Sequence, residues 1–238
     1  MKMFCIVLVV FLSACSLQPL QEQKQKERVS LSLAQEFVLT NQFQKAKFYL
    51  DKMDVSLKDK VEYIRINSLY LLKTNQLEDA HSYYQKSIKL FPKDGFLLNN
   101  FGIVLMRLGK YEEACIWFRK AVEFSVGHSQ SALINLSRCL ISKDDVKKAS
   151  ILMAQAKEMG KLPYIGLLTE LNLVLIQGNN IRASQINKII QVNTKYTQLI
   201  EYKEEFECLS RHVAARESDL TSITSISPSA CIVPRYKI

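Results

Sequence analysis

The sequence repeats itself with a period of about 34 residues, and this period limits the possible folds more than any other feature. Alanine recurs at one phase of the period with separations of 34, 34, 35 and 34 residues, at Ala46, Ala80, Ala114, Ala149 and Ala183. Each alanine follows a turn-forming residue and a short polar stretch typical of a helix start, as in "NQFQKA" and "GKYEEA". Because short repeated units bury their apolar faces against their neighbours, the period predicts a stacked array of helical repeats.

The residues within each period predict two antiparallel helices per repeat. The residues four positions after the repeat alanines are large and are expected to face inward from the second helix: Leu50, Tyr84, Phe118 and Met153. In the third repeat, Gly102 lies between large residues of the first helix, where it lets the two helices cross closely. A helix-turn-helix unit of about 34 residues is the tetratricopeptide repeat. We therefore expect an all-α, right-handed superhelical solenoid of tetratricopeptide repeats.

Five such repeats account for residues 27–197 and are followed by one more helix. The expected bounds of the repeats are 27–60, 61–94, 95–129, 130–163 and 164–197. An amphipathic capping helix at 198–217 should cover the exposed face of the last repeat, with Ile200, Phe206 and Leu209 on its buried side. Beyond Glu217 the Ser, Thr and Pro content rises and no helical period survives. We expect a flexible tail over residues 218–238, with a short strand at "CIVP" as the alternative.

The first fourteen residues predict an export signal. Lys2 precedes an unbroken apolar run from Phe4 to Leu12, which is too short for a transmembrane helix of roughly 20 residues. The run ends in "LSAC", which resembles the bacterial lipobox, where a peptidase cuts before a cysteine that carries diacylglycerol. We therefore expect lipidation of Cys15 by diacylglycerol and an N-acyl chain, and sorting to the outer membrane through Ser16. Residues 15–26 would form a lipid-anchored linker.

The other cysteines and the charge of the mature chain are less specific. Four further cysteines remain in it, without a CxxC pair: Cys115, Cys139, Cys208 and Cys231. We expect buried free thiols, with disulfides as the alternative in an oxidising compartment. The formal charge of the whole chain is +9, but Lys and Arg alternate with Glu and Asp along the repeats. This pattern does not predict a nucleic-acid-binding stripe.

The sequence shows no pattern typical of catalysis or metal binding. His81, His128 and His212 lie at unrelated phases of the repeat, and none is followed four residues later by a second ligand. Cys115 stands beside a repeat alanine and is expected to be a core residue rather than a nucleophile. We predict neither an enzyme nor a metal site, and no cofactor besides the acyl chains on Cys15. An exported enzyme with a helical accessory domain is the alternative, but the repeats leave no segment long enough for a catalytic domain.

The first helices of the repeats should line a concave surface that binds a partner. The residues expected to face this groove are Arg65, Leu69, Leu72, Phe96, Asn99, Ile103, Met106, Ile134 and Arg138. Such a groove suits an extended or helical peptide, with apolar side chains giving affinity and Asn99, Arg65 or Arg138 fixing its register. The alternative for each residue is packing against a neighbouring helix.

Three segments resemble one family. The stretch "LLNNFGIVLMRLGKYEEACIWFRKAV" resembles the core repeat of the type IV pilus biogenesis and stability lipoproteins, the PilF/PilW pilotin family. "ALINLSRCL" resembles the family's NLG-type helix, with Ser137 in place of the usual glycine, and "IEYKEEF" resembles its closing segment. The fifth repeat is degenerate, and the tail after Glu217 extends beyond the usual end.

The resemblance implies an outer-membrane lipoprotein that faces the periplasm and acts as a pilotin. It would bind secretin subunits of the type IV pilus and promote their localisation and multimerisation, as a monomer and without nucleic acid. The alternative is a lipid-anchored scaffold for cell-envelope enzymes or for a tight-adherence secretion apparatus.

Overall fold

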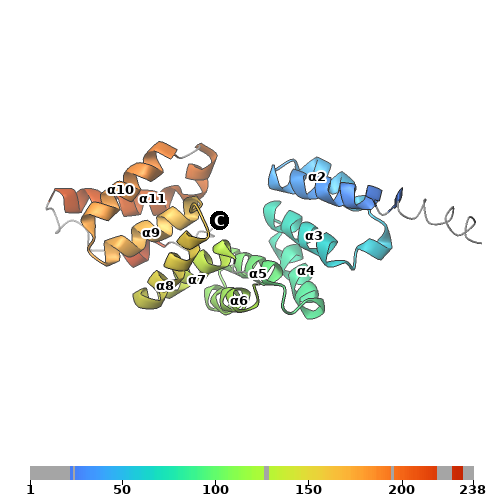
Figure 1. Ribbon diagram of the computed structural model, residues 1–238, viewed down its shortest axis with the longest axis horizontal. Coiled ribbons are helices and arrows are strands. Elements are labelled where there is room, and N and C mark those ends of the chain that lie inside the picture. Colours follow the sequence, from blue (N-terminus) through green and yellow to red (C-terminus); the bar gives the residue numbers. More distant parts are fainter. Residues whose placement is uncertain (1–21, 24, 126–128, 194–195, 219–226, 233–238) are drawn as a thin grey trace, which may run out of the picture. The chain divides into compact units, whose positions relative to one another are not determined.

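The computed structural model describes residues 22–23, 25–125, 129–193, 196–218 and 227–232 (Figure 1). Nearly all of these residues are helical, and none lies in a strand. The predicted leader, Cys15, Ser16 and His128 fall outside the described residues. None of the described helices has the length and hydropathy needed to cross a membrane.

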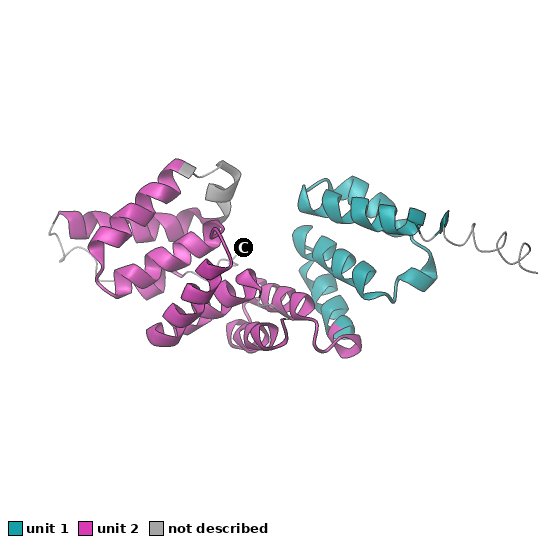
Figure 2. Ribbon diagram, viewed as in Figure 1, with its two compact units in different colours: residues 1–87 teal, residues 88–238 magenta. Residues whose placement is uncertain are grey.

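The chain divides into two compact units, residues 1–87 and 88–238, with the boundary inside helix α4 (Figure 2). The N-terminal unit contains helical residues 25–39, α2 (Phe43–Asp51), the short helix η1 (Val55–Leu57), α3 (Val61–Lys73) and most of α4 (Leu77–Leu90). Its core includes Ala34, Val38, Ala46 and Leu50, all with an exposed fraction of at most 1 %.

The C-terminal unit consists of successive helical hairpins. Its helices are α5 (Gly95–Arg107), α6 (Tyr111–Phe124), α7 (Gln130–Ser142), α8 (Val146–Glu158), α9 (Tyr164–Ile176), α10 (Asn180–Asn193), α11 (Tyr196–Glu217) and the short η3 (Pro228–Cys231). Phe118 of α6 packs against Gly102 of α5, because a β-carbon added to that glycine would lie 2.5 Å from the ring. The close helix crossing predicted for Gly102 is therefore confirmed.

The turn inside every repeat uses the same backbone geometry. One residue in each turn has a positive φ, between 58° and 75°: Asn41, Asn75, Gly109, Asp144 and Gly178. The next N–H then bonds back to a carbonyl five residues earlier, as from Lys110 to Leu105 at 2.8 Å. Gly, Asn and Asp tolerate this left-handed conformation best, which explains why only these types occupy the position. The repeat alanines that follow are all buried, with exposed fractions of 0 or 1 %.

Helix α11 occupies the region where a capping helix was expected. Leu209 and Val213 are buried in a core shared with α9 and α10, and Phe206 packs at its edge. The side chain of Ile200 lies outside the described residues.

The expectation that the four cysteines beyond Cys15 are buried free thiols is wrong. Disulfides join Cys115 to Cys139, between α6 and α7, and Cys208 to Cys231, between α11 and η3. The Cα separations are 5.7 and 5.6 Å, within the range that a disulfide spans. The pairs lie 24 and 23 residues apart in sequence and meet only through helix packing, so no spacing motif could reveal them.

Part of the predicted flexible tail is packed against the helices. Within residues 227–232, Cys231 is fully buried, and the carbonyl of Pro228 accepts a hydrogen bond from Asn172 Nδ2 of α9 at 2.9 Å. The segment contains the short helix η3, and Cys231 and Ile232, the described part of "CIVP", are not in a strand. The sequence of this segment lacks a helical period, but the segment is nevertheless packed, because the disulfide links it to α11 and because Cys231 lies in an apolar core.

Candidate protein-binding surfaces

The residues predicted to line a groove differ widely in exposure. In the N-terminal unit, Arg65 is exposed, Leu69 is half-buried and Leu72 is buried. In the C-terminal unit, Phe96 is exposed and Ile103 and Met106 are half-buried, whereas the remaining three are buried: Asn99, Ile134 and Arg138. The last three therefore contribute to the packing of the helices.

The accessible residues of α5 form an apolar stripe, defined here as Phe96, Ile103 and Met106. Their spacing of seven and three residues puts them on one side of the helix. Asp94 fixes the start of α5 by accepting hydrogen bonds from the N–H groups of Phe96 and Leu97 at 3.0 and 3.1 Å. With 41 % of its surface exposed, Phe96 can serve as an anchor for an apolar partner.

Amide side chains link α5 to α7 beside this stripe. Asn135 Nδ2 donates to Asn99 Oδ1 at 3.0 Å, and Asn99 Nδ2 contacts Asn100 Oδ1 at 3.4 Å. Asn100 Nδ2 is buried and has no acceptor among the described residues. Asn99 is therefore already bonded within the protein, and Asn135, which is half-buried, is the member of the group nearest to solvent.

Arg138 makes a two-point ion pair within the protein. Its Nη1 and Nη2 each lie 2.7 Å from a carboxylate oxygen of Glu205 on α11, and Nη1 also lies 3.4 Å from Thr169 Oγ1 on α9. Glu205 is fully buried and Arg138 is 8 % exposed. Glu205 was not among the residues predicted from the sequence, although it lies in the "IEYKEEF" segment that carries part of the family resemblance.

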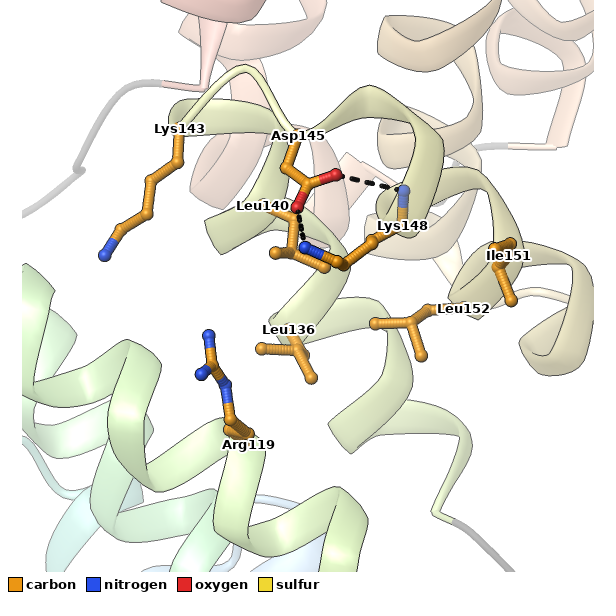
Figure 3. Close-up of a pocket in the computed structure, with 8 residues that line it drawn as sticks. All are labelled: Arg119, Leu136, Leu140, Lys143, Asp145, Lys148, Ile151 and Leu152. Carbon is orange, nitrogen blue, oxygen red and sulfur yellow. Dashed lines mark hydrogen bonds and ion pairs between the residues drawn. The ribbon is translucent and has the colours of Figure 1, made fainter.

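A second surface, which was not predicted from the sequence, is a cavity of about 490 Å³ among α6, α7 and α8 (Figure 3). Its apolar lining comes from α7 and α8: Leu136, Leu140, Ile151 and Leu152. Arg119 extends toward it from α6 and Lys143 from the turn after α7. The predicted binding residues all lie on the first helices of the repeats. A cavity that is also lined by the second helices α6 and α8 was therefore not predicted.

Among the described residues, some of the charged groups at this cavity have an ion-pair partner and one does not. Asp145 accepts hydrogen bonds from Lys148 Nζ at 2.6 Å and from Lys148 N at 3.2 Å, and these bonds lower the pKa of the Asp145 carboxyl. Lys143 pairs with Glu112. Arg119 has no hydrogen bond or ion pair within the described part of the chain. An apolar floor beside an unpaired guanidinium suits an amphipathic segment that carries a carboxylate.

A third feature is a cluster of Cys208, His212 and Cys231. Their possible ligand atoms all lie within 4.8 Å of one another. Burial lowers the pKa of the His212 imidazole, and the nearby Arg216 and Arg211 lower it further. Cys208 lies four residues before His212 on α11, and Cys231 comes from η3, which is distant from both in sequence. No histidine is followed four residues later by a second ligand, but that spacing alone does not reveal this cluster.

Comparison with known proteins supports the fold. A family model described as Tetratricopeptide repeat matches residues 83–116. The solved structure titled "Functional Characterization of Pseudomonas Aeruginosa pilF" aligns with a TM-score of 0.58 and 14 % sequence identity, over 85 % of this chain and 95 % of that chain. No curated protein matches the sequence. The all-α tetratricopeptide-like solenoid predicted from the repeat period is confirmed, and the chain has the fold of a tetratricopeptide-repeat protein.

Proposed function

We propose that this protein is a pilotin, an outer-membrane lipoprotein that binds secretin subunits of a type IV pilus and promotes their localisation and multimerisation. The observation that supports this role most strongly is the apolar stripe, in which Phe96 is exposed and Ile103 and Met106 are half-buried, in a fold similar to that of Pseudomonas aeruginosa PilF. The role requires binding and no catalysis. Tetratricopeptide solenoids act in this way, through an extended surface that holds another protein.

The lipid anchor is the second part of the proposal. Acyl chains on Cys15, each contributing about 0.8 kcal/mol per buried CH₂, would tether the protein to the inner leaflet of the outer membrane. A tethered binding domain raises the effective concentration of its partner at the membrane, which favours assembly there without any new contact. The repeats would select the secretin, and the anchor would set the place of assembly.

The stripe is tested by cross-linking in cells followed by purification of the tagged protein. Phe96→Glu and Met106→Glu should each reduce recovery of the secretin, because a hot-spot side chain contributes about 2 kcal/mol or more. Ile181→Glu is the matched control, since Ile181 is a 78 % exposed apolar residue on α10. Equal secretin recovery from all three variants, with unchanged helicity, would contradict the assignment to the stripe.

The anchor is tested separately with Cys15→Ser. This variant should accumulate as an unprocessed precursor, and the secretin should lose its outer-membrane localisation. Processing and membrane fractionation equal to those of the wild type would contradict lipidation at Cys15.

A second candidate function is a lipid-anchored scaffold for cell-envelope enzymes or for a tight-adherence secretion apparatus. The cavity lined by Arg119 and the leucines of α7 favours it, because a scaffold needs a second surface besides the stripe. Recovery of peptidoglycan enzymes without secretin in the cross-linking experiment would support this function instead.

A further inference from the structure

The cluster of Cys208, His212 and Cys231 has no role in the proposed binding function. Cys208 and His212 are four residues apart on α11 and so share one face of the helix, while η3 brings Cys231 to the same point. His212 is 4 % exposed, Cys231 is fully buried and Cys208 is half-buried. Three side chains that can bind a metal thus meet at one place in the core formed by α9, α10 and α11.

The type of donor selects the type of metal. Two sulfur atoms and one imidazole nitrogen suit a thiophilic cation, whereas Mg²⁺ and Ca²⁺ prefer oxygen ligands. Two thiolates also neutralise a divalent cation, so the loaded site carries no net charge into the apolar core. Leu209 and Val213, which lie in this core, would limit the access of water.

The distances between the candidate ligand atoms are close to those that a single ion requires. Zinc binds sulfur at about 2.3 Å and nitrogen at about 2.0 to 2.1 Å, so two ligand atoms on one ion lie at most about 4.6 Å apart. The three candidate atoms lie within 4.8 Å of one another, with the two sulfurs bonded to each other in the disulfide. Binding one ion therefore requires the two sulfurs to separate after reduction, while the imidazole nitrogen stays within a few tenths of an ångström of the required distance.

We propose that Cys208, His212 and Cys231 bind Zn²⁺ when the Cys208–Cys231 disulfide is reduced. A dithiol reductant transfers two hydrogen atoms to the two sulfurs and itself becomes a disulfide. Zn²⁺ then binds both sulfurs and the imidazole nitrogen and releases the two thiol protons, with no further electron transfer. The disulfide and the metal site exclude each other, because both use the same two sulfur atoms.

Either state holds η3 against α11. An exported chain is reduced before it reaches an oxidising compartment, so Zn²⁺ would hold the C-terminal segment in place before the disulfide forms. The metal site goes beyond the pilotin proposal and does not depend on it, whereas the order in which the metal and the disulfide form rests on the proposed export.

Metal titration of the full mature chain tests the site. In the Cys115→Ser, Cys139→Ser variant, a phosphine reduces the Cys208–Cys231 disulfide. The phosphine takes the oxygen atom of one water molecule, and each of the two sulfurs takes one hydrogen atom of that water. After anaerobic removal of the phosphine, Co²⁺ should bind one per chain, give a thiolate-to-cobalt charge-transfer band, and be displaced by Zn²⁺. The oxidised chain should give no such band.

Two further variants separate this site from other modes of binding. His212→Asn should weaken Zn²⁺ binding by at least about tenfold while far-ultraviolet circular dichroism stays unchanged. The converse variant, Cys208→Ser, Cys231→Ser with the other cysteine pair intact and reduced, should give no charge-transfer band. A band of wild-type strength in this converse variant, or equal Zn²⁺ affinity of the oxidised and reduced chains, would overturn the proposal.

Discussion

Arg138 on α7 and Glu205 on α11 form a buried two-point ion pair, with both N–O distances at 2.7 Å. The two residues are separated by 67 positions in sequence. The planar guanidinium matches the carboxylate at both oxygens, which fixes the orientation of α11 as well as its position. The pair therefore ties α11 to α7, although the α9 and α10 hairpin lies between them in sequence.

Removing one partner of this pair should destabilise the fold strongly. Glu205→Gln leaves a buried guanidinium without its counter-charge, so we expect a loss of about 3 to 5 kcal/mol in the free energy of unfolding, measured in urea. Glu207→Gln on the same helix is the control, because its pair with Lys203 is exposed and should contribute less than about 1 kcal/mol. Equal losses in the two variants would contradict a structural role for the buried pair.

Each disulfide should stabilise the protein by closing a loop in the unfolded chain. The loops span 24 and 23 residues, for which the chain-entropy model gives about 3 kcal/mol each. Replacing either pair by serines should lower the free energy of unfolding by this order. Only Cys208→Ser, Cys231→Ser should also speed amide exchange in residues 227–232, because only that disulfide holds η3. Unchanged exchange there would show that the contacts of η3 with α9 suffice.

Gly102 and Gly109 should respond differently to alanine. At Gly102 the new β-carbon would lie 2.5 Å from the Phe118 ring, so overpacking should cost about 1 to 3 kcal/mol. At Gly109 there is open space but a φ of +75°, so backbone strain should cost about 1 to 2 kcal/mol. Phe118→Leu should reduce the loss in unfolding free energy that Gly102→Ala causes. The loss caused by Gly109→Ala should stay the same. Urea unfolding of the wild type, the three single variants and the two double variants measures this coupling, and equal coupling at both glycines would contradict it.

The phenol of Tyr63 should ionise later than an ordinary tyrosine. Burial, reinforced by Tyr83 and Asp51, raises its pKa from 10.0 to about 12. The unfolded chain therefore releases this proton first, and the stability associated with the neutral phenol is present below about pH 10 and is lost as the pH rises toward 12. Tyrosinate absorbance should show a late step that disappears in Tyr63→Phe. An unchanged titration curve in this variant would contradict the assignment.

Local patterns predicted the repeats because the features that define them lie close together in sequence. Each turn needs one residue that tolerates a positive φ, and Gly109 and Asp144 appear at the expected phase. Contacts between distant segments leave no such pattern. Glu205 reaches Arg138 only because α11 packs against α9, beside which the Arg138 side chain extends from α7, so a groove inferred from ideal repeat positions counted Arg138 as available. The Cys208–Cys231 pair likewise depends on how η3 folds back.

Salt should separate the two candidate surfaces, because their chemistry differs. The stripe is apolar, so Phe96→Glu should weaken secretin binding by about tenfold or more, while binding to the wild type changes little between low and high salt. Arg119→Glu at the cavity should leave secretin affinity unchanged. If Arg119→Glu weakens binding instead and the affinity of the wild type falls steeply with salt, the secretin occupies the cavity through an acidic segment. Measuring both variants with the purified periplasmic part of the secretin at two salt concentrations assigns the partner to one surface.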